Sequence, residues 1–147
     1  MNKKKIFLVV NCGNDNEYNA ATEIDKIINK NGFGWFAKYG NPIKFSKLYL
    51  DYPDDEIVLC LSIFINGQHR IYPYSIMEIS DTFMGTEGSY PEYYKQKIHN
   101  IKTWIKVKKY TGEKINYEDL VVKSSLKKLS ESIRKSMSGY IICKLLS

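Results

Sequence analysis

The stretch from Glu56 to Ile65 (EIVLCLSIFI) is almost continuously apolar and ends at Asn66-Gly67. An apolar run of this length without polar alternation is typical of a strand buried on both faces. Asn-Gly is the strongest short signal for a hairpin turn. We therefore expect a central strand over 56–65 and an antiparallel partner over about 68–79. Pro73 cannot donate to a strand ladder, so it predicts an edge or a bulge in that partner.

The rest of the chain alternates strand and helix patterns around this hairpin. Ala21, Ile24 and Ile28 recur at helical spacing, whereas Ile105 and Val107 alternate with polar neighbours as in a strand. The patterns predict a first strand over 4–11, a helix over 17–30, a short strand or extended loop over 33–39, one further turn around 45–50, a long loop over 80–95, a strand over 102–110, a helix ending at 139 and a last strand over 140–145.

This order of elements predicts one α+β domain over residues 1–147. The chain is long enough to bury a real core, and 44% of its residues are hydrophobic. No repeat or linker divides it. The expected architecture is a curved mixed sheet or a small closed barrel with flanking helices.

The N-terminus and the cysteines indicate a cytoplasmic protein. The apolar run that follows Lys5 stops at Asn11, short of the ~7 residues that a signal core needs, and no stretch reaches the ~20 residues of a membrane span. Cys60 and Cys143 lie in apolar runs that suit reduced core cysteines. No histidine has ligand-spaced companions, so we expect no metal and no cofactor.

The net charge of +6 is compatible with an anionic partner or simply with solvated lysine faces. Phosphate-binding and nucleophile-elbow motifs are missing from the sequence. Neither His69 nor His99 has an obvious partner for acid–base chemistry, and Asp54-Asp55 lies in an expected turn. The sequence therefore favours a binding protein, without catalytic residues, over an enzyme.

An aromatic, glycine-rich stretch is the strongest candidate for a binding surface. Residues 31–42 (NGFGWFAKYGNP) place Trp35 and Phe36 beside flexible backbone. Trp35 can be core filler next to a turn or the wall of a pocket for a flat ligand. The sequence leaves both interpretations open.

In this order the elements resemble the PUA-like superfamily, and within it the EVE and YTH domains. The likeness rests on a first strand ending in small polar residues (9–13), an aromatic strand (34–37), the hairpin over 57–79, a late strand (KTWIKVK, 102–108) and a polar SIRKS motif at 132–136. YTH domains place a base-cage tryptophan in the aromatic strand. The tryptophan of their second wall is missing from 85–89, so Phe83, Tyr90 or Tyr93 has to replace it.

The resemblance implies a small PUA-like barrel that binds DNA or RNA carrying a modified, flipped-out base. EVE-like domains also serve as modules of GTP-dependent restriction enzymes, so a GTPase or nuclease partner or fused domain is a further expectation. The implied base-binding residues are Trp35, Phe36, Ala37, Asn11, Asn14, Asn16, Phe83, Tyr90 and Tyr93. The implied contacts to the nucleic-acid backbone are Arg134, Lys135, Ser136 and Lys38.

Two alternatives belong to other classes of function. Related ASCH domains hydrolyse modified nucleosides, and such an enzyme would require a cleft lysine, Lys38 or Lys44, with an acidic partner. The other alternative is a protein-interaction module, such as a phage-encoded inhibitor of a defence system.

Overall fold

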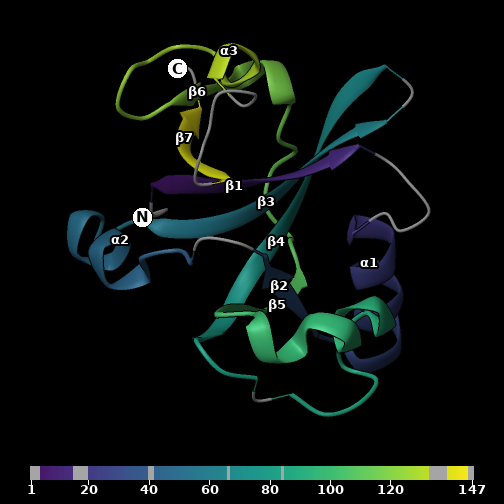
Figure 1. Cartoon of the computed structure of the whole chain (residues 1–147). Helices are drawn as coiled ribbons and strands as arrows, with labels where there is room; N and C mark the ends of the chain where they lie inside the picture. Colours follow the sequence, from purple (N-terminus) through teal and green to yellow (C-terminus); the bar gives the residue numbers. More distant parts are fainter. Residues whose placement is uncertain are drawn as a thin grey trace.

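The computed structural model describes residues 4–14, 20–39, 42–65, 67–83, 85–132 and 139–145, without the side chains of 13, 14, 65, 93, 96, 97 and 99. The elements in chain order are β1 (Lys5–Asn14), α1 (Ala20–Asn31), β2 (Gly34–Lys38), α2 (Phe45–Asp51), β3 (Glu56–Ile65), β4 (Gln68–Ser80), the 3₁₀ helix η1 (Glu92–Asn100), β5 (Thr103–Lys109), the 3₁₀ turn η2 (Tyr117–Asp119), β6 (Leu120–Val122), α3 (Leu129–Ser132) and β7 (Tyr140–Leu145). Figure 1 shows their arrangement.

The described strands form one mixed, seven-stranded sheet in the order β2-β5-β4-β3-β1-β7-β6. Strands β1 and β3 run parallel, and every other neighbouring pair is antiparallel. The apolar run over 56–65 is the middle strand, as its pattern predicts. The hairpin is also confirmed: Ile65 pairs with Gln68, and Gly67 has the positive φ of 78° that this turn needs.

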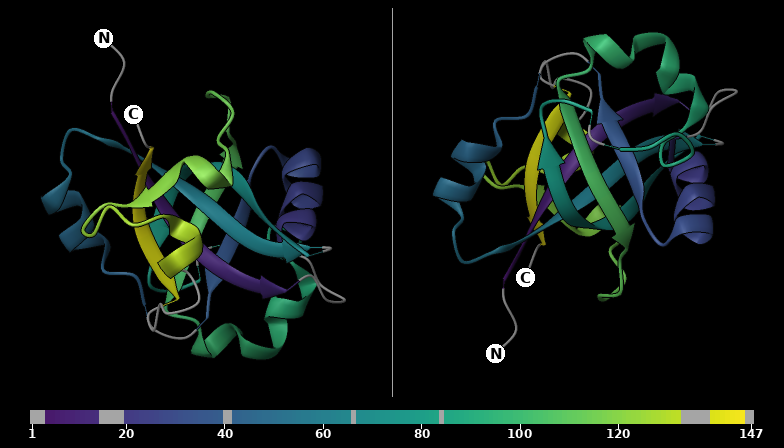
Figure 2. Two further views of the ribbon diagram at one scale, coloured as in Figure 1. Left: turned by 90° about the horizontal axis from the view of Figure 1, so that it is seen from above. Right: turned by 90° about the horizontal axis from the view of Figure 1, so that it is seen from below.

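The sheet is curved but open, so the α+β class is confirmed and the closed-barrel alternative is wrong. Strands β2 and β6 stand at opposite ends of the strand order, and no ladder among the described residues joins them. The strands cross one another steeply in both views of Figure 2. A side-chain contact connects β2 with β7, where the Nζ of Lys38 lies 5.6 Å from the centroid of the Tyr140 ring.

Pro73 lies where β4 is locally an edge. It pairs with Cys60 of β3, whereas the pairing with β5 begins only at Tyr74. The missing N–H therefore interrupts no second ladder. The bulge in β4 lies farther along, between Ile76 and Glu78.

The concave side of the sheet holds the main core. Alternate residues of β1, β3 and β5 point into it, including Leu8, Leu61 and Val107, and Ala21, Ile24 and Ile28 of α1 pack against them. Phe45 and Leu48 of α2 belong to the same core, and the two helices lie at opposite ends of it, α2 at the left and α1 at the right of Figure 1. The amphipathic spacing that predicts α1 is therefore the spacing that buries it.

Two further clusters of buried side chains cover the outer face of the sheet. Phe7, Val9 and Cys143 pack with Leu120 and Leu129 near β6 and α3. The second cluster lies under η1 and gathers the aromatic side chains on the outer face of β2 and β5.

The sequence does not predict three features of the fold. These are the helix η1, the short strand β6 and the late start of the last helix. The expected end of that helix, 133–138, lies outside the described residues.

Candidate functional site

A cavity of about 270 Å³ opens at the free edge of β2, and we call it the β2-edge cavity. One wall comes from the end of β2, another from the end of β1, and the rest from α1, η1 and the residue before β7. Its lining residues are Val10, Asn11, Cys12, Ala20, Phe36, Ala37, Lys38, Tyr39, Tyr94 and Gly139. The cavity therefore brings together predicted site residues from segments that are far apart in the sequence.

Strand β2 has a hydrogen-bonded neighbour on one side only, which leaves its other backbone edge open. The N–H of Trp35 points to this open edge and donates to the carbonyl of Ser89 at 2.8 Å. Backbone groups two residues apart in an antiparallel strand point the same way. Ala37 therefore turns its N–H and C=O to the open edge as well, where it lines the cavity.

Lys38 places a cation inside the protein at the same point. The residue is only 4% exposed, and its Nζ donates to the carbonyl of Tyr39 at 3.2 Å. The Nζ also lies 5.6 Å from the centroid of the Tyr140 ring. Burial lowers the pKa of Lys38 from its ordinary value, because the interior disfavours the charged form. The cavity thus combines a donor-only polar group with aromatic surface.

Aromatic rings form the side of the cavity near η1. Tyr39 and Tyr94 meet edge to face with their centroids 5.8 Å apart, and Tyr94 stacks on Tyr90 at 6.5 Å. Tyr94 is almost fully buried, whereas Tyr39 is 40% exposed and reaches the surface. Phe36 adds a ring from the concave face of the sheet. A flat ligand would meet ring faces and edges here.

Trp35 lies on the other face of β2 and belongs to the core under η1. Its residue exposure is 3%, and it clusters with Tyr90, Tyr94 and Trp104, with Phe83 partly buried beside them. The sequence predicts Trp35, Phe83 and Tyr90 as facing walls, and the structure does bring them together. However, none of these three residues belongs to the described lining of the cavity.

The polar residues predicted for the site are only partly described. Asn11 lines the cavity, and its N–H donates to the carbonyl of Gly139 at 3.0 Å. The backbone of Asn14 belongs to β1, but its side chain and that of Tyr93 lie outside the described residues, as does Asn16. Arg134, Lys135 and Ser136 also lie outside them. Gly139, which follows that segment, is part of the lining.

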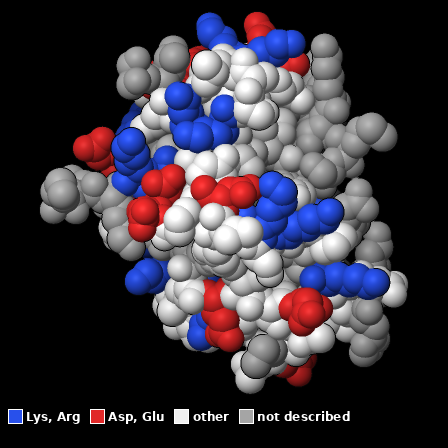
Figure 3. Space-filling model, turned by 90° about the vertical axis from the view of Figure 1, so that its left-hand side faces the viewer, with Lys and Arg blue, Asp and Glu red and all other residues white. Residues whose placement is uncertain are grey.

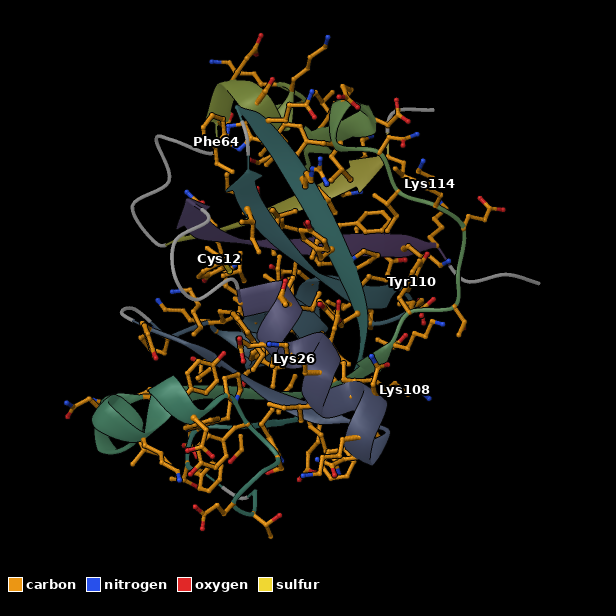
Figure 4. All side chains as sticks on the ribbon, turned by 90° about the vertical axis from the view of Figure 1, so that its right-hand side faces the viewer. Cys12, Lys26, Phe64, Lys108, Tyr110 and Lys114 are labelled. Atoms are coloured by element: carbon orange, nitrogen blue, oxygen red, sulfur yellow. The ribbon has the colours of Figure 1, made fainter. Side chains whose placement is uncertain are left out.

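Several lining residues are absent from the site predicted from the sequence, among them Cys12, Tyr39 and Gly139. Figure 4 shows Cys12 near the end of β1, beside α1. Burial raises its pKa to about 12, so it is an inert thiol in the wall. Tyr39 is the last residue of the segment predicted over 33–39, so the aromatic pattern that singled out Trp35 and Phe36 also contains it. Gly139 carries no such signal because only the β1–β7 pairing brings it here.

Other classes of site find no support in the described part of the chain. Within it, no group of three or more His, Cys, Asp or Glu side chains could hold a metal ion. All three cysteines are free, and Cys60 and Cys143 are buried as expected. Within the same residues, no helix combines the length and the apolar character needed to cross a membrane.

Comparisons with known proteins add no relative. No family model, no curated protein and no solved structure matches the chain.

Proposed function

We propose that the protein is a non-enzymatic domain that binds nucleic acid and holds one modified, flipped-out base in the β2-edge cavity. The observation that carries the proposal is the cavity itself, where ring faces, an open strand edge and a buried lysine meet. The proposal keeps Phe36, Ala37 and Asn11 in contact with the base, and it moves Lys38 from the expected backbone contact to the base-binding cavity. It assigns the stacking surface to Tyr39 instead of Trp35, with Tyr94 packed edge to face against the Tyr39 ring.

The size and the rings of the cavity suit a single base. Its volume of about 270 Å³ lies just under the ~300–1,000 Å³ typical of pockets for drug-sized ligands, so a smaller flat group fits it. A base that leaves a helical stack loses a few kcal/mol, and stacking on an aromatic side chain restores roughly 1–3 kcal/mol. Tyr39 supplies this surface at the mouth of the cavity.

The polar groups of the cavity can distinguish the edges of a base. Ala37 presents both a backbone donor and a backbone acceptor, Asn11 an amide, and Lys38 donors only. Such groups reject a ligand that leaves them unpaired, since an unsatisfied buried polar group costs about 1–3 kcal/mol. The net charge of +6 adds a general attraction to phosphates.

The test compares oligonucleotides that differ only in one base modification. Fluorescence anisotropy would measure the binding of DNA and RNA carrying a central cytosine, 5-methylcytosine, adenine or 6-methyladenine. We expect one methylated base to bind most tightly. Tyr39→Ala should weaken that binding about 5- to 150-fold, as expected for the loss of one stacking partner, whereas Tyr39→Phe retains it.

Tyr49→Ala is the matched control for this series. Tyr49 is a similarly exposed tyrosine, at 47%, and lies on α2 outside the cavity. Its replacement should leave the affinity unchanged. Equal binding of all the oligonucleotides, or equal losses for Tyr39→Ala and Tyr49→Ala in folded proteins, would contradict the proposal.

A second candidate function is favoured by the lowered pKa of Lys38. A larger neutral fraction makes a lysine amine a better base or nucleophile, as a nucleoside-processing enzyme requires. Lys44, the other lysine considered for this role, is exposed beside α2 and is not part of the described lining. Incubation with acylated nucleosides tests this candidate. Turnover that Lys38→Met abolishes would support it, and no turnover by the wild-type protein would remove it.

A further inference from the structure

A second hollow lies between α2 and the start of β7, and we call it the α2–β7 groove. Its volume is about 420 Å³. Its lining residues are Ile43, Lys44, Lys47, Leu48, Asp51, Tyr52, Val122, Lys123, Ser124, Tyr140, Ile141 and Ile142. Figure 3 shows the face of the molecule that carries α2, where basic side chains lie among acidic ones.

The groove is adjacent to the β2-edge cavity. Gly139 lines the cavity, and the next residue along the chain, Tyr140, lines the groove. A strand rises only about 3.3 Å per residue, so the two hollows nearly meet at this point. Lys38, from the cavity wall, holds its Nζ 5.6 Å from the centroid of the Tyr140 ring. A chain whose base occupies the cavity can therefore continue directly into the groove.

The groove combines aromatic surface with positive charge. Tyr52 and Tyr140 contribute rings, and Leu48 and Ile142 contribute apolar side chains. Lys44 and Lys123 are exposed, and the Nζ of Lys123 lies 5.7 Å from the centroid of the Tyr52 ring. The combination of rings for bases with cations for the backbone is the one that binds single strands of nucleic acid.

The acidic group in the groove is already balanced. Asp51 accepts a hydrogen bond from Lys47 at 2.7 Å, one turn earlier in α2. The charge of this carboxylate is therefore offset within the helix. Lys44 and Lys123 are the cations that remain to meet a phosphate from the two sides of the groove.

We infer that the α2–β7 groove holds the nucleotide that flanks the base in the cavity. Its base packs against Tyr52 and Tyr140, and its phosphates lie near Lys44 and Lys123. The inference rests on the proposed function, because the strand enters the groove from the β2-edge cavity. It assigns contacts to the nucleic-acid backbone beyond those that the sequence suggests in the SIRKS motif.

The experiment compares a nucleoside, which reaches only the cavity, with an oligonucleotide, which reaches both hollows. The probes are 5-methyldeoxycytidine, 6-methyldeoxyadenosine and ~10-nucleotide single strands that carry each base at the centre. The test variant is Lys44→Gln/Lys123→Gln. The control is Lys26→Gln/Lys30→Gln, which removes the same charge from α1, where Figure 4 marks Lys26.

Loss of two phosphate contacts should lower the slope of log affinity against log salt by about 1.4 for a single strand. If both proteins bind equally at about 1 M salt, that slope difference amounts to roughly a 25-fold weaker affinity at ~0.1 M. The control should change the affinity several-fold less. Nucleoside binding should be the same for all three proteins.

The outcomes separate the two proposals. One result is that the test variant retains nucleoside binding and shows an unchanged oligonucleotide affinity and salt slope. That result would overturn the assignment of the groove without affecting the assignment of the cavity. If neither nucleoside binds the wild-type protein, the proposed function fails. Competition by polyglutamate as strong as that by an unmodified oligonucleotide would show a general anion surface and overturn the inference.

Discussion

Replacing Trp35 with alanine removes a ring that is 3% exposed and packs among the aromatic residues under η1. Truncating such a residue typically costs about 3–5 kcal/mol of unfolding free energy. In a domain of this size each kcal/mol shifts the Tm by about 2–4 °C, so the Tm should fall by roughly 6–20 °C. Trp35→Phe keeps a ring in the cluster and should cost clearly less.

Equilibrium unfolding in urea, followed by circular dichroism, measures these differences. Leu50→Ala is the control, because Leu50 is 79% exposed and its loss should change the unfolding free energy by at most about 0.5 kcal/mol. Base preference is then measured on the folded Trp35→Phe variant, where we expect it to be unchanged. A Trp35→Ala protein as stable as Leu50→Ala would refute the core assignment. If a stable Trp35→Phe protein lost its base preference, Trp35 would instead be a residue that contacts the base.

Two further predictions concern Lys38 and Gly85. Because burial lowers the pKa of Lys38 in the folded state, the unfolded chain binds more protons as the pH approaches the unperturbed value of about 10.4. The unfolding free energy of the wild type, measured relative to that of Lys38→Met, should therefore rise with pH between the folded and unfolded pKa values of Lys38. If urea titrations showed that this difference in unfolding free energy stays flat or falls, the prediction would be contradicted. In Gly85→Ala the new Cβ would lie 2.7 Å from Cδ1 of the buried Trp35, so we expect a loss of about 1–3 kcal/mol by thermal denaturation. A Tm equal to that of the wild type would show that this loop does not cover Trp35.

The parts of the fold that follow from local pattern could be predicted from the sequence. The apolar run over 56–65, the Asn66-Gly67 turn and the spacing of Ala21, Ile24 and Ile28 each specify an element by themselves. The alternation of Ile105 and Val107 with polar neighbours predicts a strand over 102–110, and β5 spans Thr103–Lys109. These features depend on neighbours within a few residues, which a single sequence displays.

The features that depend on distant pairing could not be predicted. Strand β6 has three residues and is defined by its pairing with β7, for example of Val121 with Lys144. The open sheet likewise depends on which distant strands pair with one another. The order of strands and helices in the sequence is equally compatible with a sheet that closes into a barrel.

The candidate site shows the same division. The stretch that holds Phe36, Ala37 and Lys38 was identified because aromatic residues and glycines stand together there. The orientation of Trp35 was not, because burial of the outer face of β2 depends on η1, more than 50 residues later. Cys12 and Gly139 line the cavity because β1 and β7 are neighbours in the sheet, which a local pattern does not predict.

The most direct test of the β2-edge cavity is a titration of the isotopically labelled protein with the methylated nucleosides, followed by amide NMR spectra. The account predicts that the largest shifts occur at Asn11, Ala37 and Tyr39, while the amides of α1 near Lys26 stay in place. Shifts confined to other surfaces, or no shift at a nucleoside concentration that saturates binding, would contradict the assignment of this cavity as the base-binding site.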